Sequence, residues 1–117
     1  MKLQINSLYL CVKNMDRAIK FYEDLFEQKV TERNGIYSVF DLLNGFRLGL
    51  FAYEKVNERH IFGSNCLPSI SAESLDVLKR KLTGKEICFP VTLINDNWVA
   101  EFVDSEGNHI EITAPIK

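Results

Sequence analysis

The chain has 117 residues, of which 46% are hydrophobic and 26% charged, and its formal net charge is −2 at pH 7. This length and composition favour one domain with a buried core. Because no basic stripe is visible, nucleic acid is not an expected partner. No stretch approaches the roughly 20 apolar residues that span a bilayer, and polar residues interrupt Met1–Asn6, so we expect a soluble protein without a signal peptide or membrane partner.

The cysteines indicate a reducing compartment. Cys11, Cys66 and Cys88 are odd in number and widely spaced, and none belongs to a CxxC motif. Such cysteines are typical of reduced thiols that pack as small apolar side chains. We therefore expect a cytoplasmic protein.

The first half of the chain predicts a strand, a helix and three further strands. Within Ser7–Val12, the aliphatic residues Leu8, Leu10 and Val12 stand at every second position, which is the pattern of a strand with one face on a core. Behind a predicted N-cap at Asn14, apolar residues recur at three- and four-residue steps through Met15–Phe26, which predicts a surface helix of about three turns. The dipeptides Asn34-Gly35 and Asn44-Gly45 favour hairpins between short strands at 28–34, 36–43 and 46–53.

The second half repeats this order after a polar linker at 54–63, so the half-modules are 1–53 and 64–117. We predict a strand around 65–71, a helix at 74–82, and strands at 86–94, 97–103 and 108–113. Residues 44–50 and 106–112 also match at a spacing of 62 positions, with a glycine and two aliphatic residues in register. The economical account is an internal duplication.

Two segments resemble the vicinal oxygen chelate superfamily, which includes glyoxalases, bleomycin resistance proteins and dioxygenases. Leu10–Tyr22 (LCVKNMDRAIKFY) is similar to the opening strand, polar turn and helix of that superfamily. Phe102–Ile112 (FVDSEGNHIEI) is similar to its closing hairpin. The resemblance implies an α+β fold in residues 1–117, with two βαβββ modules, eight strands and a curved mixed sheet around one cleft. It also implies a homodimer.

The resemblance places up to four metal ligands on the first and last strands of each half, here at Ser7, Gly49, Asn65 and Glu111. Histidine, glutamine or glutamate is expected at these positions, and only Glu111 fits. Glycine offers no ligand atom and serine is a poor neutral ligand, so the set falls short of what divalent ions require. We therefore expect no cofactor, and no zinc, nickel, iron or manganese that co-purifies stoichiometrically. The bleomycin-binding branch, which needs no metal, is the nearer relative in chemistry.

Strand parity assigns the residues of the presumed cleft, because alternate side chains of a strand share a face. The candidates are Ser7, Tyr9, Arg47, Phe51, Tyr53, Asn65, Trp98, His109 and Glu111. Each has an alternative role: the aromatic residues can be core packing, Arg47 can pair with a nearby acid, and Glu111 and His109 can face solvent. If Glu111 lies in the cleft, its carboxylate needs Arg47, His109 or a ligand's cation as partner.

Three functions remain open from the sequence. The first is a metal-free binding protein for a small, partly aromatic or cationic molecule, such as an antibiotic or metabolite. The second is a metal-dependent lyase, isomerase or dioxygenase that recruits His60 or His109. The third is a non-catalytic dimeric interaction module.

Overall fold

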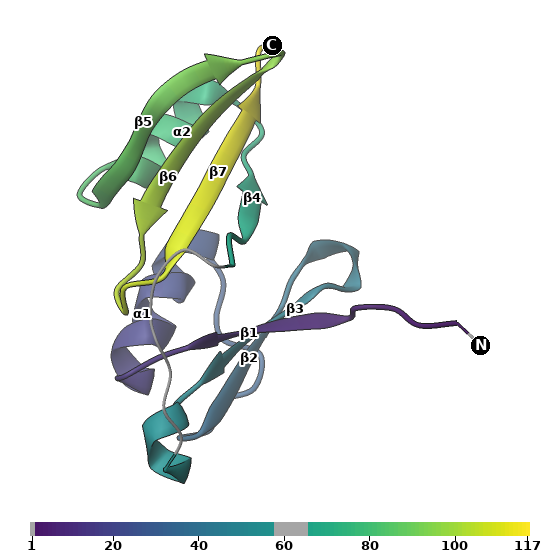
Figure 1. Cartoon of the computed structure of the whole chain (residues 1–117), viewed down its shortest axis with the longest axis vertical. Coiled ribbons are helices and arrows are strands. Elements are labelled where there is room, and N and C mark those ends of the chain that lie inside the picture. Colours follow the sequence, from purple (N-terminus) through teal and green to yellow (C-terminus); the bar gives the residue numbers. More distant parts are fainter. Residues whose placement is uncertain (1, 58–65) are drawn as a thin grey trace. The chain divides into compact units, whose positions relative to one another are not determined.

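The structure is a computed structural model that describes residues 2–57 and 66–117, and it divides into two modules, Met1–Ile61 and Phe62–Lys117. Each module has one α-helix and one mixed sheet (Figure 1). The α+β class and the two-module arrangement predicted from the sequence are therefore confirmed. Neither of the described α-helices is long and apolar enough to cross a membrane.

The first module has a three-stranded sheet in the order β1-β3-β2. Strand β1 pairs parallel to β3, and β2 pairs antiparallel to β3. The elements are β1 (Ser7–Cys11), α1 (Met15–Phe26), β2 (Tyr37–Asp41), the 3₁₀ helix η1 (Leu43–Gly45), β3 (Arg47–Phe51) and the 3₁₀ helix η2 (Tyr53–Val56).

Helix α1 forms where its capping and apolar pattern predict it. The side chain of Asn14 accepts a hydrogen bond of 2.9 Å from the backbone N–H of Arg17, which satisfies one of the unpaired donors of the first turn. Tyr22 lies in the apolar stripe of the helix and is fully buried. Its ring packs against Phe40 of β2 at 6.4 Å between centroids, so the helix covers one face of the sheet.

The predicted strand at 28–34 is wrong. Within that segment only Glu32 forms a bridge, with Val39 of β2. The backbone N–H groups of Thr31 and Glu32 both donate to the carbonyl of Val39, so they do not continue a regular ladder. Side chains make two further hydrogen bonds: Glu23 accepts from the N–H of Val30, and Thr31 accepts from the N–H of Asp41. Because backbone pairing is limited to this one bridge, the segment stays irregular and the described residues contain seven strands where eight were expected.

The second module has a four-stranded sheet in the order β4-β7-β6-β5. Its elements are β4 (Ser69–Ser71), α2 (Leu75–Leu82), β5 (Glu86–Ile94), β6 (Asn97–Val103) and β7 (His109–Pro115). Strand β4 pairs parallel to β7, whereas the other neighbours are antiparallel. Helix α2 is capped by Ser74, whose hydroxyl accepts from the N–H of Val77, and it lies on one face of the sheet (Figure 1).

The duplication inferred from sequence has structural counterparts. Gly45 and Gly107 occupy equivalent hairpins and have positive φ angles of 75° and 92°, which glycine adopts without the cost that a side chain would bring. In each module the first strand pairs parallel with the last strand. The repeat in the sequence therefore reflects a repeat of topology.

Candidate functional site

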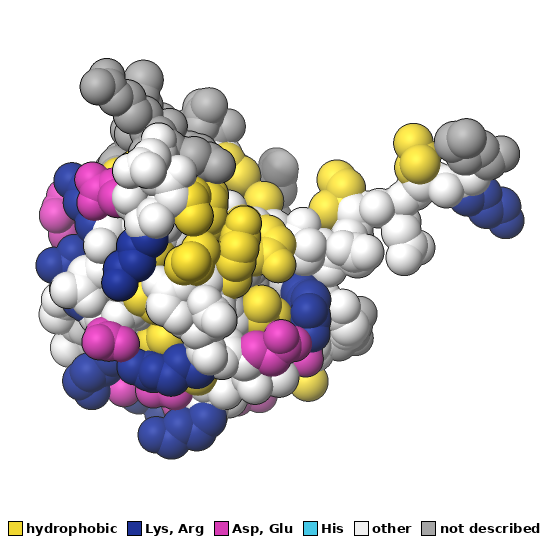
Figure 2. Space-filling model, turned by 90° about the horizontal axis from the view of Figure 1, so that it is seen from below, with side chains coloured by type: hydrophobic (Ala, Val, Ile, Leu, Met, Phe, Trp, Pro, Cys, Tyr) yellow, Lys and Arg dark blue, Asp and Glu magenta, His cyan; other side chains and the backbone are white. Residues whose placement is uncertain are grey.

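Three aromatic rings cover the face of the first sheet that is opposite α1. Tyr37 of β2 stacks on Phe51 of β3, with 4.9 Å between centroids and 8° between planes. Tyr9 of β1 meets Tyr37 edge to face at 5.9 Å. Tyr9 and Tyr37 are 44% and 50% exposed, so the rings of this aromatic platform are open to solvent. Figure 2 shows one face of the molecule on which hydrophobic side chains reach the surface beside charged ones.

Gly49 allows this arrangement. It is the register partner of Tyr9 in the β1–β3 pair, and the tyrosine ring lies directly over it. A Cβ atom at position 49 would overlap with the ring of Tyr9. The glycine is therefore required by close packing, as is typical of glycine inside a strand.

Arg47 lies on β3, the strand of Gly49, and forms ion pairs with two acidic residues. Its guanidinium donates to Asp41 at 2.8 and 3.4 Å and to Glu32 at 2.9 Å. The hydrogen bonds to Asp41, and then to Glu32, raise the pKa of Arg47 above its ordinary value. The group of Arg47, Asp41 and Glu32 has one positive and two negative charges, so its net charge is negative. It is therefore not suited to bind an anion.

In the second module, Glu111 has a hydrogen-bond partner that was not predicted from the sequence. The hydroxyl of Ser69 on the neighbouring strand β4 donates to its carboxylate at 2.6 Å. The expected partners were Arg47, His109 or a ligand, but Arg47 is engaged within the first module. Ser69 reaches Glu111 because the two residues are register partners in the parallel β4–β7 pair.

The Ser69–Glu111 bond predicts different effects of two substitutions. In Glu111→Gln the amide oxygen still accepts from Ser69, so we expect the free energy of unfolding to change by less than about 0.5 kcal/mol. Glu111→Ala removes the acceptor, and we expect a loss of about 1 kcal/mol. Urea denaturation of both variants measures the difference, and equal losses would show that the charge, not the hydrogen bond, is what matters.

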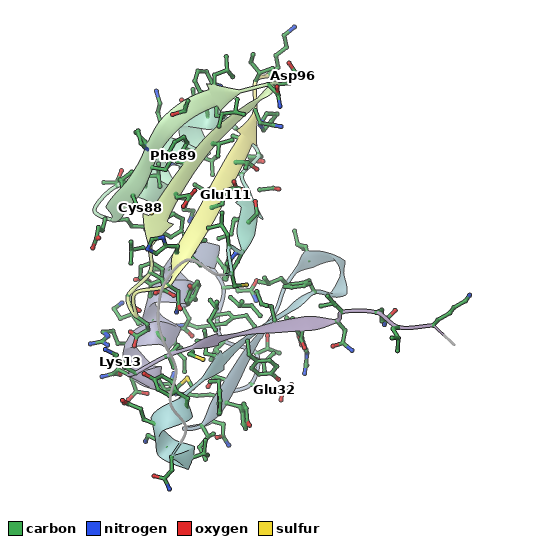
Figure 3. All side chains as sticks on the ribbon, viewed as in Figure 1. Lys13, Glu32, Cys88, Phe89, Asp96 and Glu111 are labelled. Carbon is green, nitrogen blue, oxygen red and sulfur yellow. The ribbon has the colours of Figure 1, made fainter. Side chains whose placement is uncertain are left out.

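Three strands of the second module bring a thiol, a carboxylate and an imidazole together. The Sγ atom of Cys88 lies 3.9 Å from an oxygen of Glu101 and 3.8 Å from Nδ1 of His109. Potential ligand atoms of the three residues all lie within 4.8 Å of one another. Figure 3 labels Cys88 on β5 and Glu111 on β7 of the same sheet. His109 is a predicted site residue, whereas the other two members were not predicted.

Alkylation of Cys88 is expected to depend on Glu101. Burial, and then the negative charge of Glu101, raise the pKa of the Cys88 thiol above its ordinary value. Because the thiolate is the reactive form, Glu101→Gln should lower that pKa and speed alkylation by iodoacetamide about twofold to fivefold near neutral pH. Peptide mass spectrometry in the presence of a chelator measures the rate, and Cys66 in the same sample is the control. Unchanged reactivity of Cys88 would contradict the electrostatic effect.

The remaining predicted site residues do not join either group. Ser7 is half-buried on β1, where its hydroxyl donates to Asn6 at 3.2 Å. Tyr53 is buried in η2, because β3 ends at Phe51 and the strand parity no longer applies. Trp98 lies on the same face of β6 as the buried residues Ala100 and Phe102. Glu101 lies on the other face of that strand. Asn65 and His60 lie outside the described residues.

Sequence reasoning missed Tyr37, Cys88 and Glu101. A tight two-residue turn at Asn44-Gly45 would place Tyr37 opposite Ala52, one position away from its observed partner Phe51, so the turn signal brings Tyr37 close to this site without giving the register. Glu101 lies directly opposite Glu111 in the β6–β7 pair, and the longer turn at 104–108 sets that register. The approach of Cys88 follows from register shifts in β5, and Pro90 within the second shift is the sequence signal that could have indicated them, since proline inside a strand is typical of a bulge.

Comparison with known proteins assigns the family. A family model of glyoxalase-like domains matches residues 5–117. The chain belongs to the glyoxalase-like domain family. Solved structures agree with this assignment at the level of fold, whereas none of the curated proteins matches the sequence.

Three structures illustrate the fold of this glyoxalase-like domain. A protein from Agrobacterium tumefaciens solved by NMR is 17% identical with a TM-score of 0.81, and the match covers 97% of this chain and 98% of that one. A lactoylglutathione lyase from the same organism is 16% identical with a TM-score of 0.75, covering 95% and 92%. A glyoxalase/bleomycin resistance protein/dioxygenase family enzyme from Burkholderia phytofirmans is 15% identical with a TM-score of 0.74, covering 94% and 97%.

The residues at the family's metal positions do not make a ligand set in this glyoxalase-like domain. The ring of Tyr9 covers Gly49, which has no ligand atom. The hydroxyl of Ser7 is neutral and donates to Asn6, and the carboxylate of Glu111 accepts from Ser69. Divalent transition metals require three or four protein ligands, so the described members of this set do not fit such an ion.

Proposed function

We propose that this glyoxalase-like domain binds a small, flat, cationic molecule without the use of a metal, on the aromatic platform of Tyr9, Tyr37 and Phe51. The observation that carries the proposal is the position of Tyr9. Its ring occupies the space above Gly49, at a family metal position, so an exposed aromatic surface stands there in place of a ligand atom.

The charges beside the platform favour a cation. Glu32 and Asp41 outnumber Arg47, which they hold by hydrogen bonds of 2.8 to 2.9 Å. A cation over the face of a tyrosine is attracted by the ring quadrupole, with about 0.5–2 kcal/mol per contact depending on desolvation. Flat shape and positive charge are therefore the two features that the platform would select. As part of this proposal we place the protein in the cytoplasm, since Cys11, Cys66 and Cys88 are not paired in disulfides.

The test is a thermal-shift screen of antibiotics and metabolites that includes quaternary ammonium compounds and flat aromatic cations. We expect binders to raise the melting temperature by the linkage between binding and folding. Tyr37→Ala should abolish the shift, because it removes the ring that contacts the other two. Phe46→Ala is the matched control, since Phe46 is an exposed aromatic residue of the same module outside the platform.

Two outcomes would overturn the proposal. Selective binding of anionic compounds would contradict the predicted charge preference. A shift that persists in Tyr37→Ala would place the ligand elsewhere. If no compound binds and Tyr37→Ala instead changes the sedimentation coefficient, the platform is a protein interface and the chain is an interaction module.

We also propose that the protein is a homodimer. The support is strand β5, which lies at an edge of its sheet and carries the exposed apolar residues Ile87, Leu93 and Ile94. Apolar edge strands pair readily with another chain unless they are covered. Sedimentation is expected to show a dimer, and a monomer at all concentrations would contradict it.

A further inference from the structure

The group formed by Cys88, Glu101 and His109 has the chemistry of a metal site. A thiolate sulfur, an imidazole nitrogen and a carboxylate oxygen are the three ligand types that zinc uses in proteins. Here they come from three adjacent strands, β5, β6 and β7, and their ligand atoms lie within 4.8 Å of one another. All three belong to one module and one sheet, so the sheet itself fixes their spacing.

The distances suit a tetrahedral ion. With Zn–S near 2.3 Å and Zn–N or Zn–O near 2.1 Å, tetrahedral angles place sulfur about 3.6 Å from each of the other two ligand atoms. The observed separations from Sγ of Cys88 are 3.8 Å to His109 and 3.9 Å to Glu101. The third separation, between Glu101 and His109, lies within 4.8 Å and must shorten to about 3.4 Å, so rotation of these two side chains would close the site around an ion.

The negative charges of two neighbouring glutamates favour a cation at this group. Glu101 lies directly opposite Glu111 in the antiparallel β6–β7 pair. Like charges that face each other across a sheet are destabilising. Ser69 donates a hydrogen bond to Glu111, but no such hydroxyl partner is described for Glu101, whose side chain approaches the thiol of Cys88. A divalent ion at this position would offset the repulsion.

We propose that Cys88, Glu101 and His109 bind one zinc ion, with a fourth coordination position open to water or a small molecule. Its three residues differ from the four positions that the family resemblance implies. It also lies in the second module, whereas the aromatic platform lies in the first, so the two sites can be tested separately. The expectation that no metal co-purifies was drawn from the four family positions alone, and this proposal replaces it for zinc.

Titration with Co²⁺ and Zn²⁺ tests the site in the full chain. Co²⁺ is expected to bind with a stoichiometry of one and to give a thiolate-to-metal charge-transfer band, which Zn²⁺ then abolishes. We expect Cys88→Ser to remove the band. Cys88→Ser, Glu101→Gln and His109→Gln should each weaken zinc binding by at least about 100-fold, because even outer partners of metal ligands contribute 10- to 100-fold.

Two variants serve as matched controls. Cys66→Ser removes the other cysteine of the second module, and Glu86→Gln removes an exposed carboxylate on the same strand as Cys88. Both should bind zinc within about twofold of the original chain. Melting curves of all variants in chelator verify that each one folds. A Co²⁺ complex without the charge-transfer band, or equal zinc affinity of Cys88→Ser and Cys66→Ser, would overturn the proposal.

Discussion

Replacing Asp104 by alanine is expected to lower the free energy of unfolding by about 3 kcal/mol, because the carboxylate organises the turn before β7. One of its oxygens accepts from the N–H groups of Glu106 and Asn108, both at 2.8 Å. The other accepts from the side-chain amide of Asn108 at 3.1 Å. Asp104 is buried, so water cannot easily take the place of its carboxylate. Its removal therefore leaves the N–H groups that it accepts from without an acceptor.

Urea denaturation measures this loss, with Asp96→Ala as the control. Asp96 lies in the turn between β5 and β6 and is exposed, so its truncation should change the free energy of unfolding by less than about 0.5 kcal/mol. Because the Asp104 turn presents His109, we also expect Asp104→Ala to weaken zinc binding. Similar stability of the two variants would show that the turn holds without its carboxylate.

A double-mutant cycle between Gly49 and Tyr9 is expected to show strong coupling. Gly49→Ala should cost about 1–3 kcal/mol of stability, because the new methyl group must displace the ring that packs on the glycine. In a Tyr9→Ala background the ring is gone, and the same substitution should be neutral or slightly stabilising, since alanine restricts the unfolded chain.

The coupling energy from this cycle reports directly on the contact. Gly35→Ala is the control, because a Cβ atom at Gly35 meets nothing within 4 Å. Its effect should be small in both backgrounds. Additive effects of Gly49→Ala and Tyr9→Ala would mean that the ring moves aside freely, and the aromatic platform would then lack a fixed geometry.

The fold could be predicted from sequence because the local signals agree with one another. The cap at Asn14 and the apolar stripe behind it predict α1, and turn glycines such as Gly45 set the hairpins. The irregular segment before β2 was predicted as a strand because its composition permits pairing. In the structure, two successive N–H groups share the carbonyl of Val39, and the carboxylate of Glu23 accepts from the N–H of Val30, so the contacts that interrupt the strand depend on the tertiary structure.

The candidate sites were predicted less well, for two physical reasons. Strand parity holds only while a strand continues, so it failed for Tyr53, which follows the end of β3. Strand parity also assigns a side chain to one face of the sheet, but it does not tell which residues of the neighbouring strand lie beside that side chain. Cys88 reaches Glu101 only because the register of β5 shifts on both sides of Phe89. Trp98, by contrast, could have been assigned correctly by its parity with Ala100 and Phe102.

The parallel pairing of first and last strands has a consequence for synthesis on the ribosome. Ser7 pairs with Arg47, and Ser69 pairs with Glu111, so about 40 residues separate the partners in each module. Neither sheet can close until the last strand of its module has left the exit tunnel. The first module can then fold while the second is still being translated. Nascent chains arrested before Arg47 would expose β1 without its partner, and those arrested shortly after Phe51 has emerged would carry a complete first sheet.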